Sequence, residues 1–278
     1  MKSVFDNYSI DASKHVTRSY STSFYAGVRC LDKKIRNDIH AIYGLVRFAD
    51  EIVDSFHEYD KETLLNEFEA DAFEAIERKV SINPILNSFQ ATVNKYAIDH
   101  DLIKQFFHSM RMDLTPQEYT REKYEEYILG SAEVVGLMCL RIFVYGDNEE
   151  YQKLKPSAMK LGSAFQKINF LRDIKNDFNE LGRIYFPGLE ADSITCEDKK
   201  RIEEEIELEF KEAYSGIKKL PKSSRFGVYL SYIYYLSLLK RIKRRSISDL
   251  MDSRIRVSDS QKAILFAKSY IRNSVNLL

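Results

Sequence analysis

Two segments of the sequence carry pairs of aspartates spaced four residues apart. The first pair is Asp50 and Asp54, and the second is Asp173 and Asp177, with Asn169 one helical turn earlier. A step of four residues returns to the same face of an α-helix and advances about 6 Å along its axis. Oxygen ligands of this kind on opposing helices suit Mg²⁺, which commonly holds a phosphate at the same time. The spacing therefore predicts two acidic helices that share a small, hard cation and a phosphorylated ligand.

An acidic helix face also has an ordinary explanation, because solvent-facing charge is common on helices. On the first helix, Arg47 can pair with Asp50 or Glu51 and leave a plain solvated surface. Two carboxylates about 6 Å apart repel by roughly 3 kcal/mol at an effective dielectric near 20, and in a partly closed site a cation would relieve that repulsion. The second acidic stripe favours a binding site, because it continues backwards through small or uncharged polar residues: Gly162, Gln166 and Asn169.

A third segment, residues 127–138, places small residues on a helix that is otherwise apolar. Its sequence is YILGSAEVVGLM, with Gly130 and Gly136 inside the expected helix. Gly in a helix interior costs about 1 kcal/mol relative to Ala. Close helix packing, room for a ligand or a kink would each account for that cost, and packing is the commonest of the three.

Helices must position these segments, because apolar residues recur at helical spacing over most of the chain and no Asn-Gly or Asp-Gly hairpin signal appears. The breaks between the apolar stretches are short, so we expect one all-α domain over residues 1–278 with no linker. The pattern predicts helices over residues 12–29, 34–55, 61–78, 84–97, 99–113, 121–145, 149–178, 198–219, 223–245 and 259–275.

Composition excludes several classes of protein. Of the 278 residues, 44% are hydrophobic and 30% are charged, which supports a large core and excludes general disorder. Lys+Arg and Asp+Glu both number 42, so no global charge favours nucleic acid. Cys30, Cys139 and Cys196 fit no metal-binding spacing, which favours free thiols in a reducing compartment. Residues 1–15 lack an apolar signal core, and no stretch approaches about eighteen apolar residues, so we expect a cytoplasmic protein.

Five segments, in order, resemble motifs of the squalene/phytoene synthase family of head-to-head prenyl synthases. They are residues 19–27 (SYSTSFYAG), 47–54 (RFADEIVD), 127–138, 166–177 (QKINFLRDIKND) and 183–187 (RIYFP). The resemblance runs over nearly the whole chain, and five ordered motifs are far more specific than any one of them. It implies the isoprenoid synthase fold, in which helices surround a central apolar cavity. Glu133 departs from the pattern, because the family often has Gly there.

The resemblance implies a Mg²⁺-dependent prenyltransferase, with Mn²⁺ as an alternative ion. The Asp-Glu-x-x-Asp form of the first acidic motif and residues 254–265 resemble the phytoene synthase branch. That branch joins two geranylgeranyl diphosphates head to head, through a cyclopropylcarbinyl (prephytoene) diphosphate, to give phytoene for carotenoid biosynthesis with release of diphosphate. No NADPH is expected for this reaction, and the chain has no Gly-x-Gly-x-x-Gly motif.

Two alternatives stay open. The same fold can condense farnesyl diphosphate to dehydrosqualene, or to squalene if NADPH takes part. A helical binding or assembly protein of the same fold would perform no chemistry, although all the acids of the family's metal site are present here. A metal-dependent helical phosphohydrolase fits poorly, because such sites use His-Asp pairs and only His100 precedes an Asp in this sequence.

Each site residue that the resemblance implies stands at a position that matches a family motif. Metal binding is implied for Asp50, Asp54, Asn169, Asp173 and Asp177. Catalytic roles are implied for those four aspartates and for Tyr127, which would hydrogen-bond a diphosphate or steady a carbocation with its ring. Substrate binding is implied for residues on arginine forks, at a helix start and on a loop that closes over the pocket. They are Ser21, Ser23, Arg47, Gln166, Asn169, Arg172, Arg183 and Tyr185.

Two stretches near the C-terminus each have two interpretations. Residues 229–239 (YLSYIYYLSLL) are rich in Tyr and Leu, which fill a core or line a tunnel for prenyl tails. The basic residues 240–246 (KRIKRRS) end a helix in solvent, or draw the protein to an anionic membrane, where each basic residue contributes about 1 kcal/mol. The expected partners are therefore two prenyl diphosphate molecules and, peripherally, the inner face of a membrane, but not nucleic acid.

Overall fold

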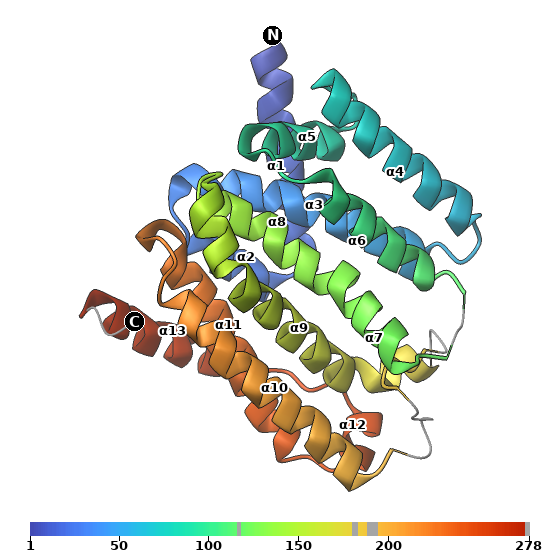
Figure 1. Cartoon of the computed structure of the whole chain (residues 1–278), viewed down its shortest axis with the longest axis vertical. Coiled ribbons are helices and arrows are strands. Elements are labelled where there is room, and N and C mark those ends of the chain that lie inside the picture. Colours follow the sequence, from blue (N-terminus) through green and yellow to red (C-terminus); the bar gives the residue numbers. More distant parts are fainter. Residues whose placement is uncertain (116–117, 180–182, 188–193, 276–278) are drawn as a thin grey trace.

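Helices form all the regular secondary structure in the part of the chain that the structure describes (Figure 1). The computed structural model describes residues 1–115, 118–179, 183–187 and 194–275. The first helices are α1 (Lys2–Tyr20), α2 (Thr22–Arg29), α3 (Lys33–Ser55), α4 (Lys61–Arg78), α5 (Pro84–Tyr96) and α6 (His100–Met112). They are followed by α7 (Arg121–Ile128), the π-helical turn η1 (Leu129–Glu133), α8 (Val134–Phe143), α9 (Asn148–Asn179), α10 (Cys196–Ile217), α11 (Lys222–Lys243), α12 (Ile247–Asp252) and α13 (Asp259–Ser274). The prediction of an all-α fold is confirmed.

Most helix boundaries follow capping signals in the sequence. Pro84 begins α5 directly after Asn83, whose side-chain oxygen accepts two amide hydrogen bonds in the first turn. The helix predicted over residues 12–29 is in fact two helices, because the Ser21 hydroxyl oxygen caps a new helix start by accepting an amide hydrogen bond of 3.2 Å. The prediction also missed α12, a six-residue helix whose capping box begins at Ser246.

The apolar core has two main parts. A cluster in the N-terminal half joins α3, α4, α5, α6 and α8, and a second cluster joins α7, α9, α10 and α11. Helix α8 packs against both α3 and α9 and so connects the two halves (Figure 1). In the described part of the chain, no helix is long and apolar enough to cross a membrane.

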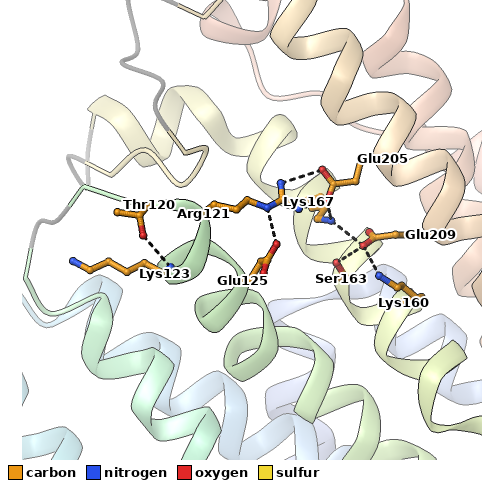
Figure 2. Close-up of polar contacts among 9 residues, drawn as sticks. All are labelled: Thr120, Arg121, Lys123, Glu125, Lys160, Ser163, Lys167, Glu205 and Glu209. Atoms are coloured by element: carbon orange, nitrogen blue, oxygen red, sulfur yellow. Dashed lines mark hydrogen bonds and ion pairs between the residues drawn. The ribbon is translucent and has the colours of Figure 1, made fainter.

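A buried polar network fastens α9 to its neighbours (Figure 2). The ammonium of Lys167, a side chain that is 4% exposed, donates to Glu209 Oε1 at 2.8 Å and also to Glu205, both on α10. Ser163 donates to Glu209 at 2.9 Å, and Arg121 of α7 donates to Glu205 at 3.1 Å. Because α9 carries the second acidic motif, these contacts fix the helix that presents it.

Close packing explains Gly130, one of the small residues of segment 127–138, and also Gly162 on the neighbouring helix. A Cβ added to Gly130 would lie 2.5 Å from the carbonyl oxygen of Gln105 on α6. A Cβ added to Gly162 of α9 would lie 2.8 Å from the carbonyl oxygen of Ala132, which belongs to the π-helical turn. Both glycines therefore let backbones approach each other, and a π-helical turn stands between α7 and α8.

Candidate active site

An apolar cavity of about 330 Å³ is walled chiefly by α3, α8, α9 and α11, with contributions from α2 and α10. Aliphatic and aromatic side chains dominate its lining, among them Leu31, Val46, Leu140, Phe143 and Leu220. No charged side chain lines it among the residues that the structure describes. The central apolar cavity expected from the sequence is therefore present, and its wall is suited to a long hydrocarbon chain.

The two acidic pairs continue the stripes of α3 and α9 that line this cavity. On α3 the stripe runs through Ile39, Tyr43, Val46, Asp50 and Asp54. On α9 it runs through Leu161, Phe165, Asn169, Asp173 and Asp177. Both pairs lie near the C-terminal ends of their helices, where the helix dipole adds partial negative charge. One end of an uncharged cavity is thus flanked by two acidic helix ends.

Burial and like charge raise the pKa of two of these carboxyls. The pKa of Asp50 rises to about 7, first because of desolvation and then because of repulsion from Asp54. The pKa of Asp177 rises to about 8, first because of desolvation, then because of repulsion from Asp173, with Asp54 and Asp113 adding to it. The influence of Asp54 on Asp177 means that the acidic ends of α3 and α9 face each other. Carboxyls whose negative charge is this poorly compensated form a site that favours a cation.

Arg183 connects the segment after α9 to this acidic end. Its Nη1 donates to Asp54 Oδ1 at 2.9 Å, and its Nη2 donates to the carbonyl oxygen of Asp113 at 2.7 Å. Its backbone amide donates to the carbonyl oxygen of Asp177 at 2.8 Å. With 10% of its side chain exposed, Arg183 lies beside the acidic helix ends, where the resemblance placed a substrate-binding loop.

Asp113, which the sequence analysis did not single out, organises the polar cluster beside this end of the cavity. It is 8% exposed and accepts hydrogen bonds from the hydroxyls of Tyr127 at 2.5 Å and Tyr185 at 3.0 Å. Burial raises the pKa of Asp113 to about 6, although Arg183 opposes that rise. Asp113 is the residue directly after α6, and nothing in the spacing of its neighbours indicated a site.

Tyr127 and Tyr185 lie beside the cavity rather than in its wall. The two rings are 4.8 Å apart between centroids, and Tyr185 stacks on Phe170 at 4.2 Å. The hydroxyls of both tyrosines are held by Asp113, and neither side chain belongs to the cavity lining. In this arrangement the Tyr127 hydroxyl is bound to Asp113, so Tyr127 supports the polar cluster at the acidic end.

Arg47 lies one turn before Asp50 and has a donor left over. Its Nη2 pairs with Glu51, and its guanidinium carbon lies 4.3 Å from the centroid of the Tyr20 ring. Its Nε is buried and has no hydrogen-bond partner in the described part of the chain. A buried donor without an acceptor is costly, so Arg47 fits an anionic ligand that would accept from it.

Two arginines compensate the negative charge of Asp173 on α9. Arg172 Nε donates to Asp173 Oδ1 at 2.9 Å. Arg254 lies in the segment between α12 and α13 and had no role assigned from the sequence. Its Nε forms an ion pair with Asp173 Oδ1 at 2.6 Å. Asp173 is therefore neutralised by cations from two segments, and both guanidinium groups lie within reach of a phosphate bound there.

The uncharged polar residues of the predicted site divide between the cavity wall and the start of α2. Gln166 and Asn169 line the cavity, and Asn169 Oδ1 accepts a hydrogen bond of 3.2 Å from Tyr235. Ser21 caps α2, and its side chain lies next to the Tyr43 hydroxyl. Ser23 is a partly buried residue in the first turn of α2, with no hydrogen bond to α3 or α9 among the described residues.

The carboxylates could hold a metal ion only together with further ligands. Within the described residues, no three His, Cys, Asp or Glu side chains converge closely enough to form a metal site by themselves. The donor set is nevertheless the oxygen set that Mg²⁺ prefers, and this ion usually takes one or two carboxylates and completes its shell with phosphates and water. The predicted metal ligands Asp50, Asp54, Asn169, Asp173 and Asp177 therefore fit an ion that binds together with a diphosphate.

Comparison with known proteins identifies a family and relatives of this chain. Residues 17–261 match the family model described as squalene/phytoene synthase. The chain is 27% identical over 286 residues to phytoene synthase 1, chloroplastic, of Solanum lycopersicum, covering 95% of this chain and 68% of that protein. It is 28% identical over 288 residues to the chloroplastic phytoene synthase of Cucumis melo, covering 96% of this chain and 67% of that protein.

Solved structures with the same fold include a dehydrosqualene synthase in complex with a ligand, with a TM-score of 0.83 at 21% identity over 97% of this chain and 98% of that one. A squalene synthase from Alicyclobacillus acidocaldarius has a TM-score of 0.76 at 21% identity, over 87% of this chain and 95% of that one. These likenesses identify the isoprenoid synthase fold. Because the family model spans most of the sequence, the chain belongs to the squalene/phytoene synthase family.

Proposed function

We propose that the protein joins two prenyl diphosphates head to head. One observation carries this proposal: the acidic pairs of α3 and α9 continue the walls of an uncharged apolar cavity of about 330 Å³. A prenyl diphosphate likewise combines a charged head group with an apolar chain. The head group is thereby directed to the acidic helix ends, and the chain is directed into the cavity.

A divalent cation would link the acidic helix ends to the diphosphates. We assign Mg²⁺, or Mn²⁺ in its place, to the oxygen ligands Asp50, Asp54, Asn169, Asp173 and Asp177. When bound, the ion supplies positive charge that stabilises the departing diphosphate. The raised pKa values of Asp50 and Asp177 support this assignment, because burial first and repulsion from neighbouring carboxylates second disfavour their ionised forms, and a bound cation would offset both.

Arginine and helix-start donors complete the binding of the head groups. Arg47 offers its buried, unpartnered Nε, and Arg172 lies beside Asp173 on the opposite helix. A guanidinium fork binds phosphate oxygens in a fixed orientation. Ser21, at the start of α2, is a further donor next to the acidic end, because it neighbours Tyr43 on the cavity stripe of α3.

The cavity wall protects the reactive carbon chain. In the first step, the C1–O bond of one substrate breaks and diphosphate leaves. The C2=C3 double bond of the other substrate attacks the allylic cation, and loss of a proton closes the ring of a cyclopropylcarbinyl diphosphate. In the second step, that diphosphate ionises, the carbon skeleton rearranges, and loss of a proton gives a central triene. The apolar lining excludes water that would quench the cations, and the rings of Phe165 and Tyr235, which stack on each other, are part of that lining.

We assign geranylgeranyl diphosphate as the substrate and phytoene as the product, which places the protein in carotenoid biosynthesis and requires no NADPH. The sequence similarity to phytoene synthases over most of the chain supports this choice. Condensation of farnesyl diphosphate to dehydrosqualene is the second candidate, and the fold shared with a dehydrosqualene synthase favours it. Squalene would require NADPH in addition, and a helical binding protein without chemistry would lack any turnover.

A product assay separates these candidates. The purified chain is incubated with Mg²⁺, without NADPH, and with either geranylgeranyl or farnesyl diphosphate, and the organic extract is analysed by mass spectrometry. We expect a C40 triene from the C20 substrate. A C30 triene from the C15 substrate alone would keep the mechanism and change the substrate. No diphosphate release from either substrate, in a folded protein, would overturn the proposed function.

The product of either reaction is too apolar to dissolve in water. We therefore expect the protein to contact the inner face of a membrane peripherally. We also propose that it acts in the cytoplasm and has no nucleic acid partner. The basic residues 240–246 suggested such a contact from the sequence.

A further inference from the structure

A second groove, of about 350 Å³, lies between α11 and α13, away from the residues assigned to the active site. Its apolar lining comes from Tyr229, Ile233 and Leu236 of α11 and from Leu265 of α13. Helix α13 packs on α11 at the outer edge of the molecule (Figure 1). The groove is therefore an apolar recess on the outside of the fold.

The charged residues around this groove all have one sign. Lys240, Lys268 and Arg272 line it, and within the described part of the chain no carboxylate does. The Arg272 guanidinium carbon lies 5.9 Å from the centroid of the Tyr229 ring. Lys240 and Lys268 form no ion pair among the described residues, so their charge is available to an external anion. The groove combines an apolar floor with a cationic rim, which is complementary to an amphiphile with an anionic head.

The solvent-facing side of α13 extends this character. Ile264, Tyr270, Ile271 and Val275 are between 54% and 62% exposed. Ile264, Ile271 and Val275 recur at helical spacing and form an outward apolar stripe, with Lys268 on its border. The one acidic residue of α13 is Asp259, at its first position. A helix with an exposed apolar stripe and basic residues beside it is the type that lies in a membrane interface.

The structure changes the membrane contact that the sequence suggested. The basic run 240–246 does not form one patch, because two of its cations are used within the fold. Arg241 donates to the carbonyl oxygen of Arg256 at 3.1 Å, and Lys243 pairs with Glu207 at 2.6 Å. Lys240 instead joins Lys268 and Arg272 at the groove, so the cationic surface is centred on α11 and α13 together.

Helix α11 separates this groove from the active-site cavity. Gly227, Val228, Ser231 and Tyr235 line the cavity, whereas Tyr229, Ile233, Leu236 and Lys240 line the groove. At 100° per residue these two sets lie on opposite sides of one helix. If the proposed function holds, a single helix separates the hydrocarbon product from this outer face.

We propose that Lys240, Ile264, Lys268, Ile271 and Arg272, named here the α13 surface, seat the protein on a membrane that contains anionic lipids. The cationic rim of the groove binds lipid phosphates, and the outward stripe of α13 enters the boundary between head groups and acyl chains. That the hydrocarbon product leaves near this surface rests on the proposed function, whereas binding of the surface to the membrane does not.

Co-sedimentation with vesicles tests the proposal on the full chain. We expect strong binding to phosphatidylcholine vesicles that contain phosphatidylglycerol and weak binding to phosphatidylcholine alone. The variant Lys240→Gln/Lys268→Gln should bind about 25-fold more weakly, at about fivefold for each basic residue removed. The variant Ile264→Ser/Ile271→Ser should lose about tenfold or more, because two half-buried aliphatic side chains no longer enter the bilayer.

A matched control removes two exposed lysines on other helices. Lys14→Gln/Lys123→Gln changes the net charge equally, on α1 and α7, and should bind vesicles as the unmodified chain does. A reporter is also available, because the chain has no Trp. In Ile264→Trp, at a position of the outward stripe that is 54% exposed, the fluorescence should shift to shorter wavelength when anionic vesicles are added.

Three results would overturn the proposal. The first is no binding of the folded chain to anionic vesicles, and the second is equal weakening by the control pair, which would mean unspecific charge attraction. The third is a self-association that Ile264→Ser/Ile271→Ser abolishes without any vesicle binding, which would mean that a second copy of the chain covers α13. Prenyl transfer from detergent-dispersed substrate is measured separately, so a failure here leaves the proposed function intact.

Discussion

Replacing Lys167 by Met should destabilise the protein strongly, because the residue is a buried partner of two carboxylates. Its ammonium lies between Glu209 and Glu205, and its side chain is 4% exposed (Figure 2). Removing one partner of a buried ion pair costs about 3–5 kcal/mol, because the other charge stays buried without compensation. Glu209 is especially dependent on this contact, since its Oε2 has no hydrogen-bond partner in the described residues.

The lower end of that range applies here. Lys160 remains 3.5 Å from Glu209, Ser163 keeps its hydrogen bond, and Glu205 still pairs with Arg121 at 3.1 Å. We therefore expect Lys167→Met to lower the free energy of unfolding by about 3 kcal/mol. With an unfolding entropy of about 2.1 cal/mol/K for each of the 278 residues, the corresponding loss in melting temperature is about 5 °C.

Urea unfolding of the single and double variants measures this effect. In Lys167→Met/Glu209→Leu both buried charges are gone, so most of the lost stability should return, and the cycle should give a coupling of about 2 kcal/mol. Lys200→Met is the matched control, because Lys200 and Glu204 are exposed and 3.9 Å apart, and it should cost less than about 0.5 kcal/mol. A Lys167→Met variant as stable as this control, or a double variant whose losses simply add, would refute the reasoning.

Three further predictions concern the surroundings of the site. The pKa of Glu133 is raised by burial to about 7, so its ionisation costs stability as the pH rises from about 4.5 to 7. Glu133→Gln should therefore stabilise the protein by roughly 1–2 kcal/mol at pH 8 and leave it unchanged near pH 4, as urea unfolding at both pH values will determine. Asp113→Asn should lower turnover about 10- to 100-fold in a folded protein, because it removes charge-assisted hydrogen bonds that hold the polar cluster. Diphosphate release measures the turnover and circular dichroism checks the fold, and unchanged turnover would contradict this role. Gly130→Ala should lower the free energy of unfolding by about 1–3 kcal/mol in thermal unfolding, since its Cβ would lie 2.5 Å from a carbonyl oxygen of α6. Gly136→Ala should be tolerated, because its Cβ would lie 3.4 Å from its nearest neighbour, and equal effects of the two variants would contradict the packing argument.

The helical fold and the two acidic helices were predictable because they depend on local pattern. Aspartates at a spacing of four must share a helix face, and the apolar stripe on α3 continues directly into Asp50 and Asp54. The break at Asn83 was visible for a similar reason, since a cap followed by Pro begins a helix wherever it stands.

Other features depend on contacts between distant segments, which spacing does not reveal. Asp113 gains its role only because α6 ends beside Tyr127 and Tyr185. Arg254 reaches Asp173 across 81 residues of sequence. The basic run 240–246 read as one patch in the sequence, but an ion pair of Lys243 with Glu207 and a hydrogen bond of Arg241 to the Arg256 carbonyl oxygen divide it. The capping role of Ser21 was also missed, because a single Ser between two helical stretches is a weak signal.

The most direct test of the central claim is diphosphate release from geranylgeranyl diphosphate in the presence of Mg²⁺. It is compared for the unmodified chain, Asp50→Asn, Asp177→Asn and the control Asp71→Asn, which alters an exposed acid on α4. We predict release that depends on Mg²⁺, that is retained in Asp71→Asn and that is lost in the two site variants while all four proteins stay folded. Release that continues unchanged in Asp50→Asn and Asp177→Asn would contradict this prediction.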